Sequence, residues 1–224
     1  DHRDLHRVDR RQRQMCIRDR KEFWGLRFEV SPAVLIPRPE TELLVERVIG
    51  CLRRRSDAAR ILDLGTGSGC VAVAAAFECR ACRPQLHVTA VDLSAEALEL
   101  AVRNAQIHNV ADRVSFVCGD WFDPLDRGRF DVIAANPPYV AANDPSLAPE
   151  LAYEPAQALF AGPEGTEIVE QLIGAAPAWL APGGVFLCEL GAGQAASLRH
   201  KLRMDLIAHR DLAGIERVIE VRRL

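Results

Sequence analysis

Short apolar runs and amphipathic segments alternate along most of the chain. The apolar runs are nearly continuous, which is typical of strands buried on both faces, and they cover residues 60–65, 87–93, 113–120, 130–136 and 182–191. The segments between them have apolar residues at helical spacing, and they cover residues 70–78, 95–109, 165–179 and 194–202. Strands that alternate with helices predict an α/β fold with a mostly parallel sheet.

Both ends of this region depart from the alternation. Residues 206–212 and 216–223 are apolar runs joined by a short turn, which predicts a C-terminal antiparallel strand pair. Residues 23–30 alternate apolar and polar side chains, which predicts a short strand or a hairpin, and a proline-rich loop follows. Apolar residues then recur at helical spacing after Thr41, which we predict to be the N-cap of a helix.

Residues 1–21 differ from the rest of the chain. They hold eight Arg or Lys and four Asp, with no helical or strand periodicity. A basic nucleic-acid arm is one interpretation, but the four Asp dilute its charge, and we favour a disordered or foreign leader. The expected organisation is therefore this leader followed by one domain, residues 22–224, with a hairpin and loop arm (22–40) and an α/β core (41–224).

Composition narrows the choice of partners and compartment. The 224 residues carry a net charge of −3, which gives no global argument for nucleic acid or an anionic membrane. No apolar run is long enough to span a membrane, and the polar N-terminal residues lack a secretory signal. We interpret the seven cysteines as reduced cytosolic thiols, and the Cys79/Cys82 pair lacks the partners of a zinc site. We expect a cytoplasmic protein without a metal.

The stretch LDLGTGSGC, residues 62–70, joins the first predicted core strand to its helix. Gly65, Gly67 and Gly69 allow a tight turn and a close approach of the backbone to a ligand. A dinucleotide fingerprint would need a further glycine where Cys70 stands, so a nicotinamide oxidoreductase is disfavoured. The pattern D-x-G-x-G-x-G instead resembles that of class I S-adenosylmethionine-dependent methyltransferases, which implies their Rossmann-like fold. Asp63 suits the cationic end of the methionine moiety.

Further candidates stand at the ends of the next two strands. Asp92 can accept hydrogen bonds from ribose hydroxyls, Asp120 from an adenine amino group, and Trp121 can lie on the adenine ring. Parallel strands bring such positions to one edge of the sheet, so we predict a binding site for S-adenosyl-L-methionine there. Together with the residues that the resemblance to methyltransferases implies, its candidates are Asp63, Gly65, Thr66, Gly67, Ser68, Gly69, Asp92, Asp120, Trp121 and Asn136.

The fourth core strand ends in Asn136-Pro137-Pro138-Tyr139. Two consecutive prolines end a strand and hold the adjoining residues rigid. This motif resembles that of methyltransferases acting on a planar, weakly basic nitrogen, either an exocyclic base amine or a carboxamide. The Asn136 side-chain carbonyl and the Pro137 backbone carbonyl can accept both N–H groups of such a nitrogen, and Tyr139 can pack on the planar group.

Two flanking stretches narrow the substrate. Residues 23–46, which contain IPRPET, and residues 150–165, ELAYEPAQALFAGPEG, resemble the release factor glutamine methyltransferase family (HemK/PrmC type). Its members methylate the N5 amide of the glutamine in the GGQ motif of peptide chain release factors. The resemblance covers residues 22–224. It implies the release factor as partner, the catalytic residues Asn136, Pro137 and Tyr139, and a substrate site of Asn136, Pro137, Pro138, Tyr139, Arg38, Pro39, Glu40 and Thr41.

The family also carries a small helical domain that grips the release factor, and residues 1–21 match nothing in it. The resemblance therefore implies an N-terminally truncated member in which donor binding survives and the grip on an intact release factor is affected. We expect a monomer.

Two alternatives stay open. A nucleic-acid amino-methyltransferase acting on adenine N6 or guanine N2 would use the same motif, but it must flip a base and grip phosphates. Outside residues 1–21, the only dense basic run is Arg53 to Arg55. A binding module that has lost its activity is the second alternative, and the intact glycine loop and Asn136–Tyr139 motif argue against it.

Overall fold

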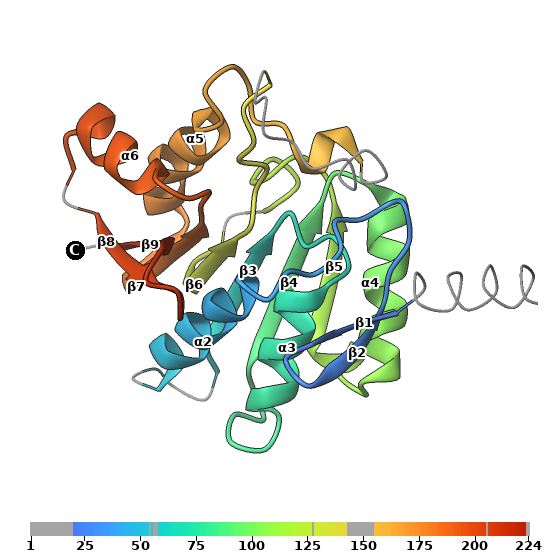
Figure 1. Cartoon of the computed structure of the whole chain (residues 1–224). Coiled ribbons are helices and arrows are strands. Elements are labelled where there is room, and N and C mark those ends of the chain that lie inside the picture. Colours follow the sequence, from blue (N-terminus) through green and yellow to red (C-terminus); the bar gives the residue numbers. More distant parts are fainter. Residues whose placement is uncertain are drawn as a thin grey trace, which may run out of the picture.

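A seven-stranded sheet forms the centre of the computed structural model, which describes residues 20–53, 55, 58–126, 128–142, 155–204 and 206–222 (Figure 1). The strand order is β5-β4-β3-β6-β7-β9-β8. The strands are β3 (Arg60–Leu64), β4 (His87–Asp92), β5 (Val114–Cys118), β6 (Phe130–Ala135), β7 (Leu180–Glu189), β8 (Ile207–Arg210) and β9 (Glu216–Arg222). Strands β3 to β7 pair in parallel, and β9 runs antiparallel to both β7 and β8. The predicted fold class is confirmed.

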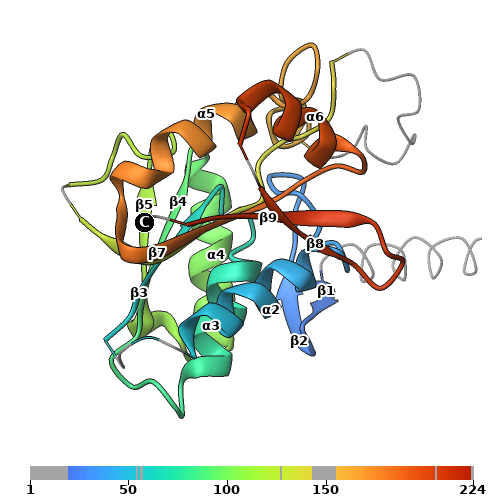
Figure 2. The ribbon, with the colours of Figure 1, turned by 90° about the vertical axis from the view of Figure 1, so that its left-hand side faces the viewer.

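Helices cover both faces of this sheet (Figures 1 and 2). The α-helices are α2 (Thr41–Leu52), α3 (Cys70–Cys79), α4 (Ala95–Ile107), α5 (Glu167–Ala175) and α6 (Gln194–Leu202), and the 3-10 helices are η1 (Ala111–Arg113), η3 (Ala156–Ala158) and η4 (Ala176–Ala178). One apolar core joins α2, α3 and α4 to the sheet, and a second joins α5 and α6 to the opposite face. Successive strand residues such as Ile61 and Leu62 belong to different cores, because side chains alternate along a strand.

The N-terminal arm is a hairpin of β1 (Arg20–Phe23) and β2 (Leu26–Glu29) that packs on the α2–α4 side. The predicted hairpin is therefore confirmed, but it begins earlier than expected. Arg20 and Lys21, which we assigned to the leader, pair with Glu29 and Phe28. The two-residue turn of Trp24 and Gly25, both at positive φ, sets this register, so β1 must begin at Arg20 for Glu29 to have a partner. Residues 1–19, the rest of the assigned leader, lie outside the described residues.

A buried asparagine ties this hairpin to the glycine loop. The Asn104 side chain on α4 accepts a hydrogen bond from the Glu29 amide at 2.8 Å. It donates to the Glu29 carbonyl at 3.0 Å and to the Ser68 carbonyl at 2.8 Å. The arm, α4 and the loop after β3 are thus held together by one fully satisfied carboxamide.

The two predicted helix caps have different outcomes. Ser94 caps α4, since its hydroxyl accepts from the Ala97 amide at 3.2 Å. Thr41 is not the N-cap of α2. The N-cap is Glu40, whose backbone is already in the helical conformation. The backbone winds before the helix begins, because the Thr41 amide donates to the Arg38 carbonyl at 3.1 Å. The Thr41 hydroxyl therefore does not cap the helix, and it accepts a hydrogen bond from Asn136 instead. None of the helices in the described ranges is long and apolar enough to cross a membrane.

Candidate active site

The register of the sheet brings three strand ends together. Strand β3 lies between β4 and β6, and Asp63 pairs with Ala90 on one side and Ala134 on the other. The loops after these three parallel strands therefore leave the same edge of the sheet side by side. This arrangement places the glycine loop between Asp92 and Asn136. The sequence predicted that these residues share one edge of the sheet, but not the order of the strands.

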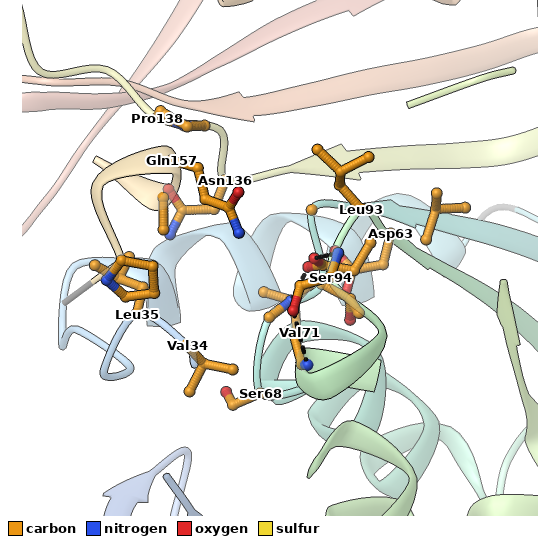
Figure 3. Close-up of a pocket in the computed structure, with 18 of the residues that line it drawn as sticks. Val34, Leu35, Asp63, Ser68, Val71, Leu93, Ser94, Asn136, Pro138 and Gln157 are labelled. Carbon is orange, nitrogen blue, oxygen red and sulfur yellow. Dashed lines mark hydrogen bonds between the residues drawn. The ribbon is translucent and has the colours of Figure 1, made fainter. Parts of the chain in front are cut away.

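A cavity of about 290 Å³ opens at this edge. Nine of the ten predicted donor-binding residues line it, namely Asp63, Gly65, Thr66, Gly67, Ser68, Asp92, Asp120, Trp121 and Asn136. The opposite wall is mostly apolar and comes from the loop before α2 and from η3, through Val34, Leu35, Pro37, Pro155, Gln157 and Ala158 (Figure 3). The predicted residues thus surround one enclosed space that can hold a ligand.

The glycines of the loop serve different contacts. Gly65 has φ +69°, and a Cβ there would lie 3.3 Å from the Trp121 ring, so this glycine lets the indole close on the loop. Gly69 has φ +80°, and a Cβ there would lie 3.0 Å from the Ala101 Cβ. Gly69 does not line the cavity. Its lack of a side chain instead allows the start of α3 to pack against α4.

Two carboxylates, those of Asp63 and Asp92, accept hydrogen bonds from the glycine loop and from the residues next to it. Asp63 is buried, and its Oδ2 accepts from the Thr66 hydroxyl at 2.6 Å and the Ala72 amide at 3.1 Å. Burial raises the pKa of Asp63 to about 6, and these hydrogen bonds oppose the rise. Asp92 accepts from the Gly67 amide at 2.7 Å and from the Ser94 amide at 2.9 Å, and burial raises its pKa as well. Both acids therefore organise the loop backbone in addition to facing the cavity.

Asn136 lines the cavity, and the two ends of its carboxamide differ in hydrogen bonding. Its Nδ2 donates to the Thr41 hydroxyl at 3.2 Å. Its Oδ1 is buried and has no hydrogen-bond partner within the described part of the chain. A buried carbonyl without a partner costs free energy, so this oxygen is suited to accept an N–H group from a bound molecule.

Tyr139 and Glu189 form a second polar contact behind the motif. The Tyr139 hydroxyl donates to Glu189 Oε1 at 3.4 Å. Glu189 ends β7 and is almost fully buried, which raises the pKa of its carboxyl to about 7 against the opposing effect of the Thr41 hydroxyl. Burial likewise raises the pKa of Tyr139 above its usual value. Tyr139 is therefore a neutral phenol at pH 7, suited to packing and hydrogen bonding rather than to proton abstraction.

The predicted substrate residues are only partly assembled around the cavity. Asn136, Pro138 and Thr41 line it, whereas Arg38, Pro39, Glu40, Pro137 and Tyr139 do not. Residues 38–41 wind into the first turn of α2, which points successive side chains in different directions and leaves Thr41 facing the cavity. The charges of Arg38 and Glu40 still act on the Tyr139 hydroxyl. Their role toward a substrate stays a prediction.

Two polar residues that line the cavity, Ser94 and Gln157, were not predicted as site residues. Neither were three polar residues that support the site from outside the cavity, namely Asn104, Glu189 and Gln194. Glu189 had a usable signal, because it is an acid at the carboxyl end of an apolar run, as Asp63 and Asp92 are. Asn104 also stood out in principle as a polar side chain within the buried stripe of α4. Gln194 had no such signal, since a glutamine at the start of a helix is ordinary.

Fold and site together define a methyltransferase. Residues 40–165 match the family model described as "Methyltransferase small domain", which is more than half of the chain. Among solved structures, a methyltransferase from Pyrococcus furiosus aligns with a TM-score of 0.61 at 21% identity, covering 97% of this chain and 98% of that one. At this identity the likeness concerns the fold.

Curated relatives identify the particular family. The release factor glutamine methyltransferase of Bordetella pertussis is 45% identical over 204 residues, which are 88% of this chain and 73% of the relative. That of Xylella fastidiosa (strain 9a5c) is 46% identical over 181 residues, which are 80% of this chain and 64% of the relative. The chain belongs to the release factor glutamine methyltransferase family, and the resemblance seen in its motifs is confirmed.

Proposed function

We propose that this chain transfers a methyl group from S-adenosyl-L-methionine to the N5 side-chain amide of the glutamine in the GGQ motif of a peptide chain release factor. The names of the relatives support this substrate. The observation that carries the proposal is the buried Asn136 Oδ1, which lacks a partner within the described residues and lies at a cavity rimmed by the glycine loop. A primary carboxamide offers the N–H group that this oxygen needs.

The cavity fits the methyl donor by its chemistry. Asp63 and Asp92 supply carboxylates for an amino group and for ribose hydroxyls, and Trp121 supplies an aromatic face for the adenine. Gly65 and Gly67 remove side chains where the ligand approaches the backbone. When bound, S-adenosyl-L-methionine supplies a sulfonium-linked methyl group, and the substrate nitrogen forms the new N–C bond as the C–S bond breaks.

The residues of the chain act by position. An amide nitrogen is a poor nucleophile because its lone pair is delocalised, so orienting it is the main task of the enzyme. Asn136 Oδ1 and the Pro137 carbonyl would each accept one N–H group, while Pro138 and Tyr139 would pack on the amide plane. Arg38, Pro39, Glu40 and Thr41 would complete the outer wall. The proton leaves to water after alkylation, which agrees with the absence of a base from the motif.

We further propose that the enzyme acts as a monomer in the cytoplasm and does not bind nucleic acid directly. Release factors work on ribosomes, which supports the compartment. The net charge of −3 supports a protein substrate over a polyanion.

A methyl-transfer assay with labelled donor tests the proposal. Its substrates are a purified release factor, the same factor with the GGQ glutamine replaced by alanine, and duplex DNA. Donor binding is measured separately by calorimetry. We expect label on the intact factor alone. Equal label on the replaced factor would contradict the glutamine assignment, and label on DNA would indicate an amino-methyltransferase of nucleic acid.

A further inference from the structure

Gln194 connects α6 to the end of the Asn136–Tyr139 motif. Its Nε2 donates to the Tyr139 carbonyl at 2.8 Å and to the Gly165 carbonyl at 3.0 Å. Its Oε1 accepts from the Gly191 amide at 2.9 Å. Both donor hydrogens and the acceptor of this carboxamide are used, on three segments that are far apart in the sequence. An isolated surface glutamine would not be held in this way.

The space around this contact admits no further atoms. Gly165 has φ +78°, and a Cβ there would lie 2.7 Å from the Tyr139 carbonyl oxygen and 2.9 Å from the Ala141 amide. The end of the motif and the loop before α5, residues 159–166 (the 165 loop), are therefore in backbone-to-backbone contact. Three further backbone hydrogen bonds continue the contact. The Val140 amide donates to the Leu159 carbonyl at 2.9 Å, the Ala161 amide to the Val140 carbonyl at 3.0 Å, and the Ala142 amide to the Gly162 carbonyl at 2.8 Å.

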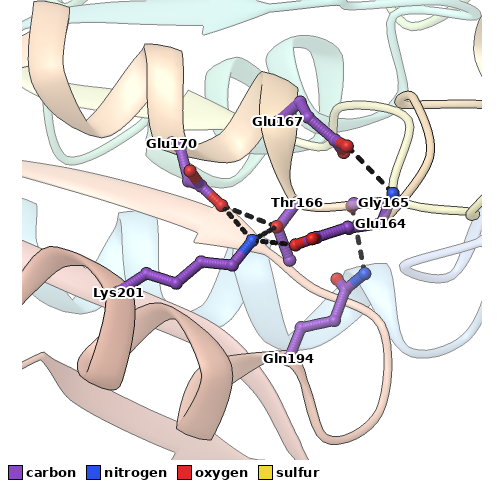
Figure 4. A network of polar contacts seen from close by, with 7 residues as sticks. All are labelled: Glu164, Gly165, Thr166, Glu167, Glu170, Gln194 and Lys201. Carbon is purple, nitrogen blue, oxygen red and sulfur yellow. Dashed lines mark hydrogen bonds and ion pairs between the residues drawn. The ribbon is translucent and has the colours of Figure 1, made fainter.

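The same helix also holds the other side of the loop. Lys201 Nζ, at the end of α6, donates to the Thr166 hydroxyl and to Glu170 Oε1, each at 2.8 Å, and pairs with Glu164 (Figure 4). Figure 4 shows Gln194 and Lys201 reaching the loop from the two ends of one helix. The loop against which Tyr139 rests is thus anchored on both sides.

Little rotational freedom separates the Tyr139 carbonyl from Asn136. Pro137 and Pro138 lie between them, and each ring fixes its own φ near −65°. A restraint on the Tyr139 carbonyl is therefore carried back along a stiff segment to the residue that presents its acceptor at the cavity. Gln194 itself is not among the residues that line the cavity.

We propose that Gln194 is a positioning residue for methyl transfer, which fixes the Tyr139 carbonyl and through it the orientation of Asn136. This inference rests on the proposed function. Because Gln194 does not line the cavity, its effect should fall on the rate of transfer and leave donor affinity unchanged.

The test uses Gln194→Ala and the isosteric Gln194→Glu, with Ser197→Ala on the exposed face of α6 as a matched control. For Gln194→Ala we expect kcat at least tenfold lower, with the Kd for S-adenosyl-L-methionine and the KM for the release factor within twofold of wild type. A glutamate at this position would face two carbonyl oxygens and repel them when ionised. When protonated it can donate to one of them, so we expect the ratio of its kcat to that of wild type to rise as pH falls from 8 to 6.

Several results would overturn the inference. The first is a kcat for Gln194→Ala within twofold of wild type. The second is a kcat ratio of Gln194→Glu to wild type that does not change with pH. The third is a loss of donor binding as large as the loss of kcat, which would indicate general unfolding. Backbone hydrogen exchange tests, independently of turnover, whether Gln194 restrains the backbone that follows Tyr139. The Val140 and Ala142 amides should exchange faster in Gln194→Ala, and unchanged exchange would contradict this restraint. If the wild-type chain methylates no release factor, the proposed function is contradicted. The hydrogen-exchange result would still test the restraint by Gln194, because it does not require turnover.

Discussion

The side-chain amide of Asn136 donates to the hydroxyl of Thr41 at 3.2 Å, which joins the end of β6 to the first turn of α2, 95 positions earlier in the chain. This contact uses the donor end of the carboxamide. The acceptor end, Oδ1, is consequently the one left without a partner among the described residues. Under the proposed function, the oxygen that would accept a substrate N–H group is thus selected by the hydroxyl of Thr41.

Removal of the Asn136 side chain should separate catalysis from donor binding. In Asn136→Ala we expect most of the turnover to be lost, on the order of a hundredfold in kcat, because the oxygen orients the nitrogen in the transition state. The Kd for the methyl donor should change by less than about threefold. Labelled-methyl kinetics and calorimetry measure the two quantities, and an equal loss in both would contradict this division of roles.

Thr41 should control catalysis through the Asn136 amide. Thr41→Val keeps the shape of the side chain but removes the acceptor, so the Asn136 carboxamide loses the hydrogen bond that fixes its orientation. We expect kcat to fall about tenfold, equivalent to about 1.4 kcal/mol. Thr41→Ser keeps the hydroxyl and should stay close to wild type. A valine variant as active as wild type would contradict the role of the hydrogen bond. A serine variant that loses as much activity as the valine variant would show that the hydroxyl alone does not suffice.

Gly69 should be required for stability rather than for donor contacts. Gly69→Ala adds a Cβ 3.0 Å from Ala101 at a position with φ +80°, so we expect a loss of about 2 kcal/mol or more in the free energy of unfolding. Adding Ala101→Gly should relieve the contact but not the backbone strain, which denaturant unfolding of the double variant can separate. Gly50→Ala, in open space on α2, is the control and should stabilise the chain slightly. A Gly69→Ala protein as stable as wild type would contradict the packing role.

Stability should fall as pH rises through neutrality. Burial raises the pKa of Glu189 from 4.5 to about 7 and that of Asp63 from 3.8 to about 6. Both values are higher in the folded state, so the folded chain retains protons that the unfolded chain releases, and stabilisation present below pH 4 is lost as pH rises through 6 and 7. For Glu189 the shift corresponds to about 3 kcal/mol.

Glu189→Gln tests this dependence. Glutamine stays neutral and can still accept from Tyr139, so the decrease in unfolding free energy between pH 5 and pH 8 should be smaller than in wild type. Urea titrations at several pH values measure it, with Glu99→Gln on the exposed face of α4 as the control. A slope with pH unchanged from wild type would show that Glu189 does not titrate in this range.

The residues at strand ends could be predicted because two simple facts determine them. Apolar runs mark the strands, and parallel strands share one carboxyl edge, so Asp63, Asp92 and Asn136 had to lie along the same edge once the sheet was parallel. Periodicity shows which side of an element is buried. It does not show which strands are neighbours, and the insertion of β6 beside β3 rests on contacts between distant segments.

The supports of the site escaped prediction for the same reason. Thr41 matched a capping pattern, but the winding of the backbone from Arg38 left its hydroxyl for Asn136. Gln194 makes its hydrogen bonds to main-chain atoms, which carry no residue-specific signal in a sequence. The start of β7 was also missed, because Leu180 pairs with Phe130 ahead of an irregular turn that contains Pro182 and two glycines.

The position of β7 next to β6 bears on how small an active fragment of this chain can be. The match to the methyltransferase domain model ends at residue 165, before β7 begins. A protein cut there would contain the glycine loop and the Asn136–Tyr139 motif, yet β6 would become an open edge with unpaired backbone groups, prone to pair with other chains. It would also lack Glu189 and Gln194. A version that ends after α6 would regain both residues but would leave β7 as the open edge, because β7 pairs with β9. A minimal working version must therefore extend through β9, well beyond the matched segment.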